Sequence, residues 1–225
     1  MNRPILTITG ADDSVRPFDL IELSARYPFV EWGILWSKKR QGTPRYPSDS
    51  WIDLLAWHAS RAGERPNLSL HLCGAAAREV MCEGKLDGLV QPFARSDAFQ
   101  RAQFNGFDTE SYEQQRNLYG VHAFRIEPIL QVREAKHLEA AAFVAADVFG
   151  SVLYDPSGGR GKAPAEWPAL PDCKAGVAGG LRPGNVRSTF LATAASWVDI
   201  ESGVRTDDQF DLAKVRAVLD EMDAP

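Results

Sequence analysis

Short apolar runs rich in β-branched and aromatic residues alternate along this chain with longer stretches whose apolar residues recur at helical spacing. This alternation is typical of a parallel sheet whose strands are connected and covered by helices. Eight runs are predicted to be strands: Pro4–Gly10, Val30–Trp36, Asn67–Gly74, Arg101–Phe107, Pro128–Val132, Gly150–Asp155, Ala175–Gly180 and Ser196–Ile200. Eight such strands suit a closed (β/α)8 barrel, the α/β fold known as the TIM barrel.

The helices are predicted less sharply than the strands. Asp211–Asp220 has the clearest amphipathic pattern, and Asp207 or Asp208 is expected to cap it. Its apolar face is formed by Leu212, Val215, Val218 and Leu219. A second helix is expected to start near Pro183, because proline suits the first helical turn. Asp108–Gly120 is polar and weakly periodic, so we interpret it as a loop that contains a helix.

An open, doubly wound sheet is the alternative architecture. Its nucleotide-binding version requires a GxGxxG turn after an early strand, whereas the first strand here ends in Gly10-Ala11-Asp12-Asp13. The strand count favours the barrel. No internal repeat, low-complexity tract or linker divides the chain, so residues 1–225 are predicted to form a single TIM-barrel domain.

The composition favours a protein that handles small molecules. Of the 225 residues, 44% are hydrophobic, and the net charge of −5 argues against a nucleic-acid partner, which requires clustered Lys and Arg. No run approaches the ~18 apolar residues of a membrane span, and no secretory signal is apparent. Cys73, Cys82 and Cys173 lack ligand-like spacing, so we expect buried apolar fillers in a protein of the reducing cytoplasm.

In a barrel, functional groups lie at the carboxyl ends of the strands and in the loops that follow them. Any one polar residue there is explained equally well as a turn residue or a hydrogen-bonded group. The predicted strands deliver a mostly polar set to this end: Thr9, Gly10, Ser37, His71, Cys73, Gln103, Asn105, Gln131, Asp155, Gly179, Gly180, Asp199, Ser202 and Gly203.

Glycine-rich turns follow the last three predicted strands, at Ser157–Lys162, Gly179–Leu181 and Ser202–Val204. Glycine lets backbone N–H groups approach an anion, and barrels commonly bind phosphate after strands seven and eight. The alternative is that these glycines only make tight turns. We predict a phosphorylated small molecule as the ligand, bound by Gly159, Gly179, Gly180, Asp199, Ser202 and Gly203.

The same part of the chain resembles a known family. Val152–Asp155 followed by Gly158–Lys162 and Trp167 resembles the sixth strand and loop of phosphoribosylanthranilate isomerase, a barrel of tryptophan biosynthesis. Gly179–Val186 resembles its seventh strand end, and Val198–Val204 resembles its eighth. The order and mutual spacing of these motifs also agree over roughly residues 150 to 205.

The resemblance implies an Amadori rearrangement, in which an acid protonates the ring oxygen of a ribosylamine and a base removes the proton from C2. Asp155 matches the acid, and partial burial is expected to hold it protonated. Arg45 matches the arginine that holds the anthranilate carboxylate, a group that suits a planar guanidinium. The alternative for Arg45 is a surface residue of a basic loop. His71 and Asn105 are further candidates for substrate binding.

The resemblance fails at the base, because this chain has Thr9 where the family has a cysteine before the glycine that ends strand one. A threonine hydroxyl is a poor base, whereas a thiol of pKa near 8.5 can be tuned to serve. Cys73 is a possible replacement two strands away, since alternate strands share layers inside a barrel. Alternatively Cys73 is a small filler and His71 is satisfied by Gln103 or Asn105.

Other barrel chemistries are disfavoured. A Schiff-base aldolase needs a lysine at a strand end, and no predicted strand supplies one. Metal-dependent epimerases need converging ligands, but His58, His122 and His137 fall in predicted helices or loops. No metal or cofactor is therefore expected.

Three functions stay open. The first is an isomerase of a phosphorylated ribosylamine with Asp155 as the acid. The second is a non-catalytic phosphometabolite-binding barrel in which Thr9 marks lost chemistry. The third is a related isomerase or lyase with a different phosphorylated substrate, using Asp155 with His71 or Cys73.

Overall fold

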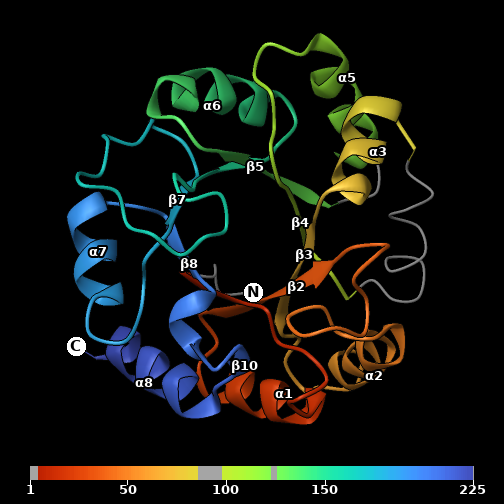
Figure 1. Ribbon diagram of the computed structural model, residues 1–225, viewed down its shortest axis with the longest axis vertical. Coiled ribbons are helices and arrows are strands. Elements are labelled where there is room, and N and C mark those ends of the chain that lie inside the picture. The colour runs from red at the N-terminus through yellow and green to blue at the C-terminus, as the bar shows by residue number, and fades with distance from the viewer. Residues whose placement is uncertain (1–4, 86–97, 123–125, 225) are drawn as a thin grey trace.

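The computed structural model describes residues 5–85, 98–122 and 126–224, and it contains a closed barrel of eight parallel strands in sequence order (Figure 1). The barrel strands are β1 (Leu6–Thr9), β2 (Val30–Trp36), β3 (Asn67–Leu72), β4 (Arg101–Phe104), β5 (Glu127–Val132), β6 (Ser151–Tyr154), β7 (Ala175–Ala178) and β8 (Trp197–Ile200). β8 pairs with β1 and closes the ring. The predicted (β/α)8 barrel is confirmed; Pro4, where the first strand was expected to begin, lies outside the described residues.

Helices surround the ring of strands on its outer side (Figure 1). They are α1 (Pro17–Arg26), α2 (Asp49–Ala59), α3 (Ala75–Glu83), α5 (Tyr112–His122), α6 (Leu138–Asp147), α7 (Val186–Thr193) and α8 (Leu212–Asp223). The described residues also contain short elements: η1 (Ala135–His137), η2 (Ser202–Val204) and the hairpin of β9 (Arg205–Thr206) and β10 (Gln209–Phe210). No helix in the described ranges is long and apolar enough to cross a membrane.

The last helix is capped differently from the prediction. Asp211 caps α8, and its Oδ1 accepts hydrogen bonds from the N–H groups of Ala213 (2.9 Å) and Lys214 (3.2 Å). Asp207 and Asp208 are not caps, because they form the turn of the β9–β10 hairpin with φ of 50° and 59°. The adjacent hairpin therefore determines where this helix begins.

Two further helix limits depend on local hydrogen bonds. α7 begins at Val186 rather than near Pro183, because the Asn185 side chain accepts the Arg182 N–H and closes a turn before the helix (2.8 Å). The polar segment expected to contain a helix does so, since α5 occupies most of it.

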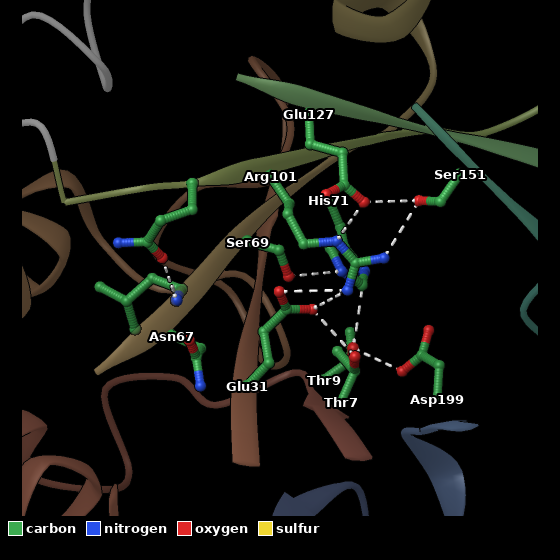
Figure 2. Close-up of polar contacts among 12 residues, drawn as sticks. Thr7, Thr9, Glu31, Asn67, Ser69, His71, Arg101, Glu127, Ser151 and Asp199 are labelled. Atoms are coloured by element: carbon green, nitrogen blue, oxygen red, sulfur yellow. Dashed lines mark hydrogen bonds and ion pairs between the residues drawn. The ribbon is translucent and has the colours of Figure 1, made fainter. Parts of the chain in front are cut away.

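The barrel has an apolar outer layer and a mainly polar interior. Residues such as Leu6, Ile8 and Leu70 point outward and pack with the helices in the main core. A smaller apolar cluster consists of Ile129, Leu153, Ala178 and Trp197, from the last four strands. Much of the remaining interior is filled by hydrogen-bonded polar side chains (Figure 2).

Arg101 organises the amino-terminal end of this interior (Figure 2). Its guanidinium contacts Glu31 and Glu127, each at 3.1 Å, and donates to Ser151 Oγ at 3.2 Å. It also lies 4.4 Å from the centre of the Trp197 ring. A buried arginine is tolerated only when its donors are satisfied in this way. This end of the barrel is thus closed by an ion-pair network, which leaves the opposite end for a site.

Candidate active site

Asp155 follows β6 and is 3% exposed. Its Oδ1 accepts from the Ser157 hydroxyl (2.7 Å), the Ser157 N–H (3.0 Å) and the Gly158 N–H (3.1 Å). Its Oδ2 accepts from the Gly159 N–H (2.7 Å) and from Gln131 Nε2 of β5 (2.8 Å). The glycine turn after β6 thus wraps around this carboxylate, and its first N–H groups are directed at Asp155.

The glycine-rich loops after β6, β7 and β8 pack against one another. Gly180 has a φ of 68°, and a Cβ there would overlap the backbone N of Ala163. A Cβ on Gly203 would overlap the carbonyl oxygen of Leu181. Glycine is required at these positions because loop backbones touch there, besides any role in anion binding.

A cavity of about 40 Å³ lies among these loops at the carboxyl ends of the strands. We call it the carboxylate cavity, because it is lined by Asp155, Gly159, Gly161, Ala178, Gly179, Gly180, Leu181, Asp199, Ile200, Glu201 and Ser202. Most residues predicted to bind phosphate therefore meet in one place beside Asp155, whereas Gly203 packs against Leu181. Phosphate binding itself stays a prediction. The volume of this cavity is that of a small group rather than of a whole sugar conjugate.

Asp199 reaches the carboxylate cavity from β8. Its Oδ1 accepts a hydrogen bond of 2.8 Å from the Thr9 hydroxyl of β1 (Figure 2). Burial raises the pKa of Asp199 to about 8, and the negative charges of Glu201, Asp155 and Glu31 act in the same direction. Thr9, at the position of the cysteine in phosphoribosylanthranilate isomerases, thus donates a hydrogen bond to a carboxyl group.

His71 lies inside the barrel beneath Thr9 and is 1% exposed. Its Nδ1 is 3.5 Å from Thr9 Oγ1, and its Nε2 is 3.1 Å from Ser69 Oγ. Burial, reinforced by Arg101, lowers the pKa of His71 to about 3, so the imidazole is neutral. The predicted partners were wrong, because Gln103 Nε2 instead donates to Asn105 Oδ1 (2.8 Å).

The neighbours of Cys73 are not the same as those of Thr9. Asn105 Nδ2 is 3.4 Å from Cys73 Sγ, and the Tyr46 hydroxyl also contacts this thiol. Burial raises the pKa of Cys73 to about 11, which disfavours the thiolate that a base requires. Cys73, Cys82 and Cys173 form no disulfide and are partly buried, and Cys82 and Cys173 pack against the main core as the expected apolar fillers would.

Arg45 is placed at the site, as the resemblance implies, but it is already paired. Its Nε donates to Glu201 Oε1 at 2.6 Å, and its N–H donates to Asp12 Oδ2 at 2.7 Å. Burial raises the pKa of Glu201, and the positive charge of Arg45 opposes this shift. A second cavity of about 480 Å³ beside the first is lined by Arg45, Gly159, Arg160, Ser202, Arg205 and Asp208.

Glu201 and Arg205 belong to the site, although neither was predicted to be a site residue. Arg205 donates to the Gly10 carbonyl (2.6 Å) and to Asp12 (3.0 Å), and so joins the loop after β8 to the loop after β1. Glu201 follows Asp199 by two residues, a spacing that places both side chains on the same side of a strand. That spacing is the signal by which Glu201 is recognisable.

No group of three or more His, Cys, Asp or Glu side chains in the part of the chain that the structure describes is arranged to hold a metal ion. Fold and site together define a (β/α)8 barrel with carboxyl groups and glycine-rich loops at the ends of its last strands. A family model for N-(5'-phosphoribosyl)anthranilate isomerase matches residues 109–221, just over half of the chain. The chain belongs to this family.

Solved structures with the same fold include members of that family. The TrpF crystal structure from Jonesia denitrificans is 15% identical, with 97% of this chain and 96% of that chain covered and a TM-score of 0.63. Phosphoribosylanthranilate isomerase from Thermotoga maritima is 17% identical, with 99% and 98% covered and a TM-score of 0.62. A truncated 3-deoxy-D-arabino-heptulosonate 7-phosphate synthase from Thermotoga maritima is 11% identical, with 98% and 85% covered and a TM-score of 0.58.

At these identities the solved structures support the fold. One such structure is a phosphoribosylanthranilate isomerase in complex with reduced 1-(o-carboxyphenylamino)-1-deoxyribulose 5-phosphate. No curated protein matches the sequence. The family match includes Asp155 and the glycine-rich loops, whereas Thr9 and Arg45 precede the matched residues.

Proposed function

We propose that this protein isomerises N-(5'-phosphoribosyl)anthranilate by an Amadori rearrangement, as a step of tryptophan biosynthesis. The observation that carries the proposal is the carboxylate cavity, which Asp155, just after β6, and Asp199 of β8 both line beside the glycine-rich loops. The reaction needs one acid and one base on either side of a sugar ring, and two carboxyl groups can supply both. The phosphate of the substrate is assigned to the backbone around Gly180 and Ser202.

The direct test is the conversion of phosphoribosylanthranilate by the purified protein. Conversion at a rate proportional to enzyme concentration supports the proposal. Complementation of a tryptophan auxotroph that lacks the isomerase is the matching test in cells. A folded, expressed protein that fails both contradicts the proposal and favours a non-catalytic phosphometabolite-binding barrel.

The pairing of Arg45 with Glu201 favours a second candidate with the same chemistry and another substrate. A guanidinium that already binds a carboxylate is neutralised, so a substrate without a ring carboxylate fits this arrangement. Comparing phosphoribosylanthranilate with the phosphoribosyl conjugate of aniline separates the candidates. A higher kcat/KM for the aniline conjugate supports the second substrate class, and a preference for anthranilate means that Arg45 exchanges Glu201 for the substrate.

A cytoplasmic location is part of the proposal. Its support is the absence of any disulfide among Cys73, Cys82 and Cys173, which suits a reducing compartment.

A further inference from the structure

The two aspartates of the carboxylate cavity have opposite environments. Asp155 accepts five hydrogen bonds, four of them from the turn that follows it. Among the described residues, Asp199 accepts one hydrogen bond, from Thr9. Donors stabilise the ionised form of a carboxyl group, and the structure supplies far more of them to Asp155 than to Asp199.

The surroundings of Asp199 favour its neutral form. Three carboxyl groups near Asp199 repel a further negative charge: Glu201 just after β8, Asp155 just after β6 and Glu31 of β2. Arg45 pairs with Glu201, and Arg101 pairs with Glu31, so neither arginine binds Asp199 directly. Thr9 of β1 is the contact between Asp199 and His71, whose ring is neutral. A pKa of about 8 agrees with this arrangement.

We propose that Asp199 is the general acid of the isomerisation and that Asp155 is its base, the reverse of the role that the family resemblance implies for Asp155. This inference rests on the proposed function, because it assigns the two proton transfers of that reaction. It also explains how the site works with Thr9 at the cysteine position: the base follows β6, and Thr9 positions the acid by hydrogen bonding to it. Two carboxyl groups in such different environments are suited to these two roles.

Asp199 gives its proton to the ring oxygen while the bond from that oxygen to C1 breaks, and the nitrogen lone pair forms a C1=N iminium. Asp155 then takes the proton from C2, and the electrons of that bond form a C1=C2 double bond and neutralise the iminium. The resulting enol becomes the ketone as C1 gains a proton and the C2 hydroxyl loses one. Proton transfer through water from Asp155 to Asp199 restores the starting state.

The test compares Asp155→Asn and Asp199→Asn with a substrate that carries deuterium at C2. Each variant is expected to lower kcat by about 10²–10⁴-fold. Removing the base makes C2 proton removal rate-limiting, so Asp155→Asn should show a full deuterium isotope effect. Removing the acid makes ring opening rate-limiting, so Asp199→Asn should show none. The opposite pattern would overturn the inference, whereas an inactive wild-type protein would overturn the proposed function itself.

A second readout uses a gentler change. The activity of the wild type should fall above about pH 8, as the acid loses its proton. Thr9→Val removes the one donor that stabilises the Asp199 anion, so this fall should move to higher pH by about one unit. Thr7→Val is the matched control on the same strand, because Thr7 donates to Glu31 instead (2.9 Å), and it should leave the fall in place. Identical pH profiles for all three proteins would exclude Asp199 as the acid.

Discussion

Gly203→Ala should be among the most damaging single-methyl additions in this protein. The added Cβ would lie 2.8 Å from Arg182 Cα and 2.9 Å from the carbonyl carbon of Leu181, and closer still to the Leu181 oxygen. All three atoms belong to the backbone of the loop after β7, so no side chain can rotate away to relieve the overlap. The loops after β7 and β8 must therefore move apart, which displaces the backbone to which the phosphate site is assigned.

Overpacking of this kind typically costs about 1–3 kcal/mol, which corresponds to a fall in Tm of about 2–12 °C for a domain of this size. Gly63→Ala is the matched control, because nothing lies within 4 Å of its Cβ position, and it should change the free energy of unfolding by less than about 0.5 kcal/mol. The measurements are thermal unfolding and calorimetric binding of inorganic phosphate. If Gly203→Ala matches Gly63→Ala in both, the close packing of these loops is not what shapes the site.

Three further changes probe the barrel interior. Arg101→Ala should lower the free energy of unfolding, measured in urea, by about 3–5 kcal/mol, because it leaves Glu31 buried without its ion-pair partner. Arg16→Ala breaks an exposed ion pair and should lower it by less than about 1 kcal/mol. Equal losses in the two variants would contradict the role of the buried network. The pKa of Asp199 is raised from 3.8 to about 8, so the folded state binds this proton more tightly than the unfolded state does. The free energy of unfolding therefore falls as pH rises from about 4 to about 8. Asp199→Asn should lack this fall, so its stability relative to the wild type should increase over that range. The pKa of His71 is lowered from 6.5 to about 3, so its contribution to the free energy of unfolding is lost as pH falls from about 6.5 to about 3. The stability of His71→Gln should therefore decrease less at acidic pH than that of the wild type, measured by unfolding at several pH values. Unchanged pH dependence in either variant would contradict the assigned shift.

The strands could be predicted because their signal is local. In β2, for example, Val30, Trp32 and Ile34 are buried against the helices and alternate with residues of the barrel interior such as Glu31, so the outward face of the strand recurs at every second residue. Helix limits depended on competing hydrogen bonds that a pattern does not contain. Asp211 and Asp207 are both plausible caps by residue type, and the hairpin before α8 decides between them.

The site was predictable only in part. Asp155 and the glycine-rich turns follow strands directly, so their place at the carboxyl end of a barrel follows from the fold class. The pairings that define the chemistry join distant parts of the chain, such as Thr9 with Asp199 and Arg45 with Glu201. They arise because β8 closes on β1, and residue spacing does not encode that contact.

The Arg101 network also bears on how the barrel selects its own strand alignment. Its partners come from different strands, Glu31 on β2, Glu127 on β5 and Ser151 on β6. A shift of β4 by one residue would turn Arg101 to the outer face and leave Glu31 buried without its counter-charge, whereas Glu127 would keep its ion pair with Lys174. Misaligned barrels are therefore penalised far more heavily by these charges than by the loss of a few apolar contacts. We expect the network to favour one strand register during folding. A variant with apolar residues in place of all its members should still fold, but with strands that can pair in more than one register.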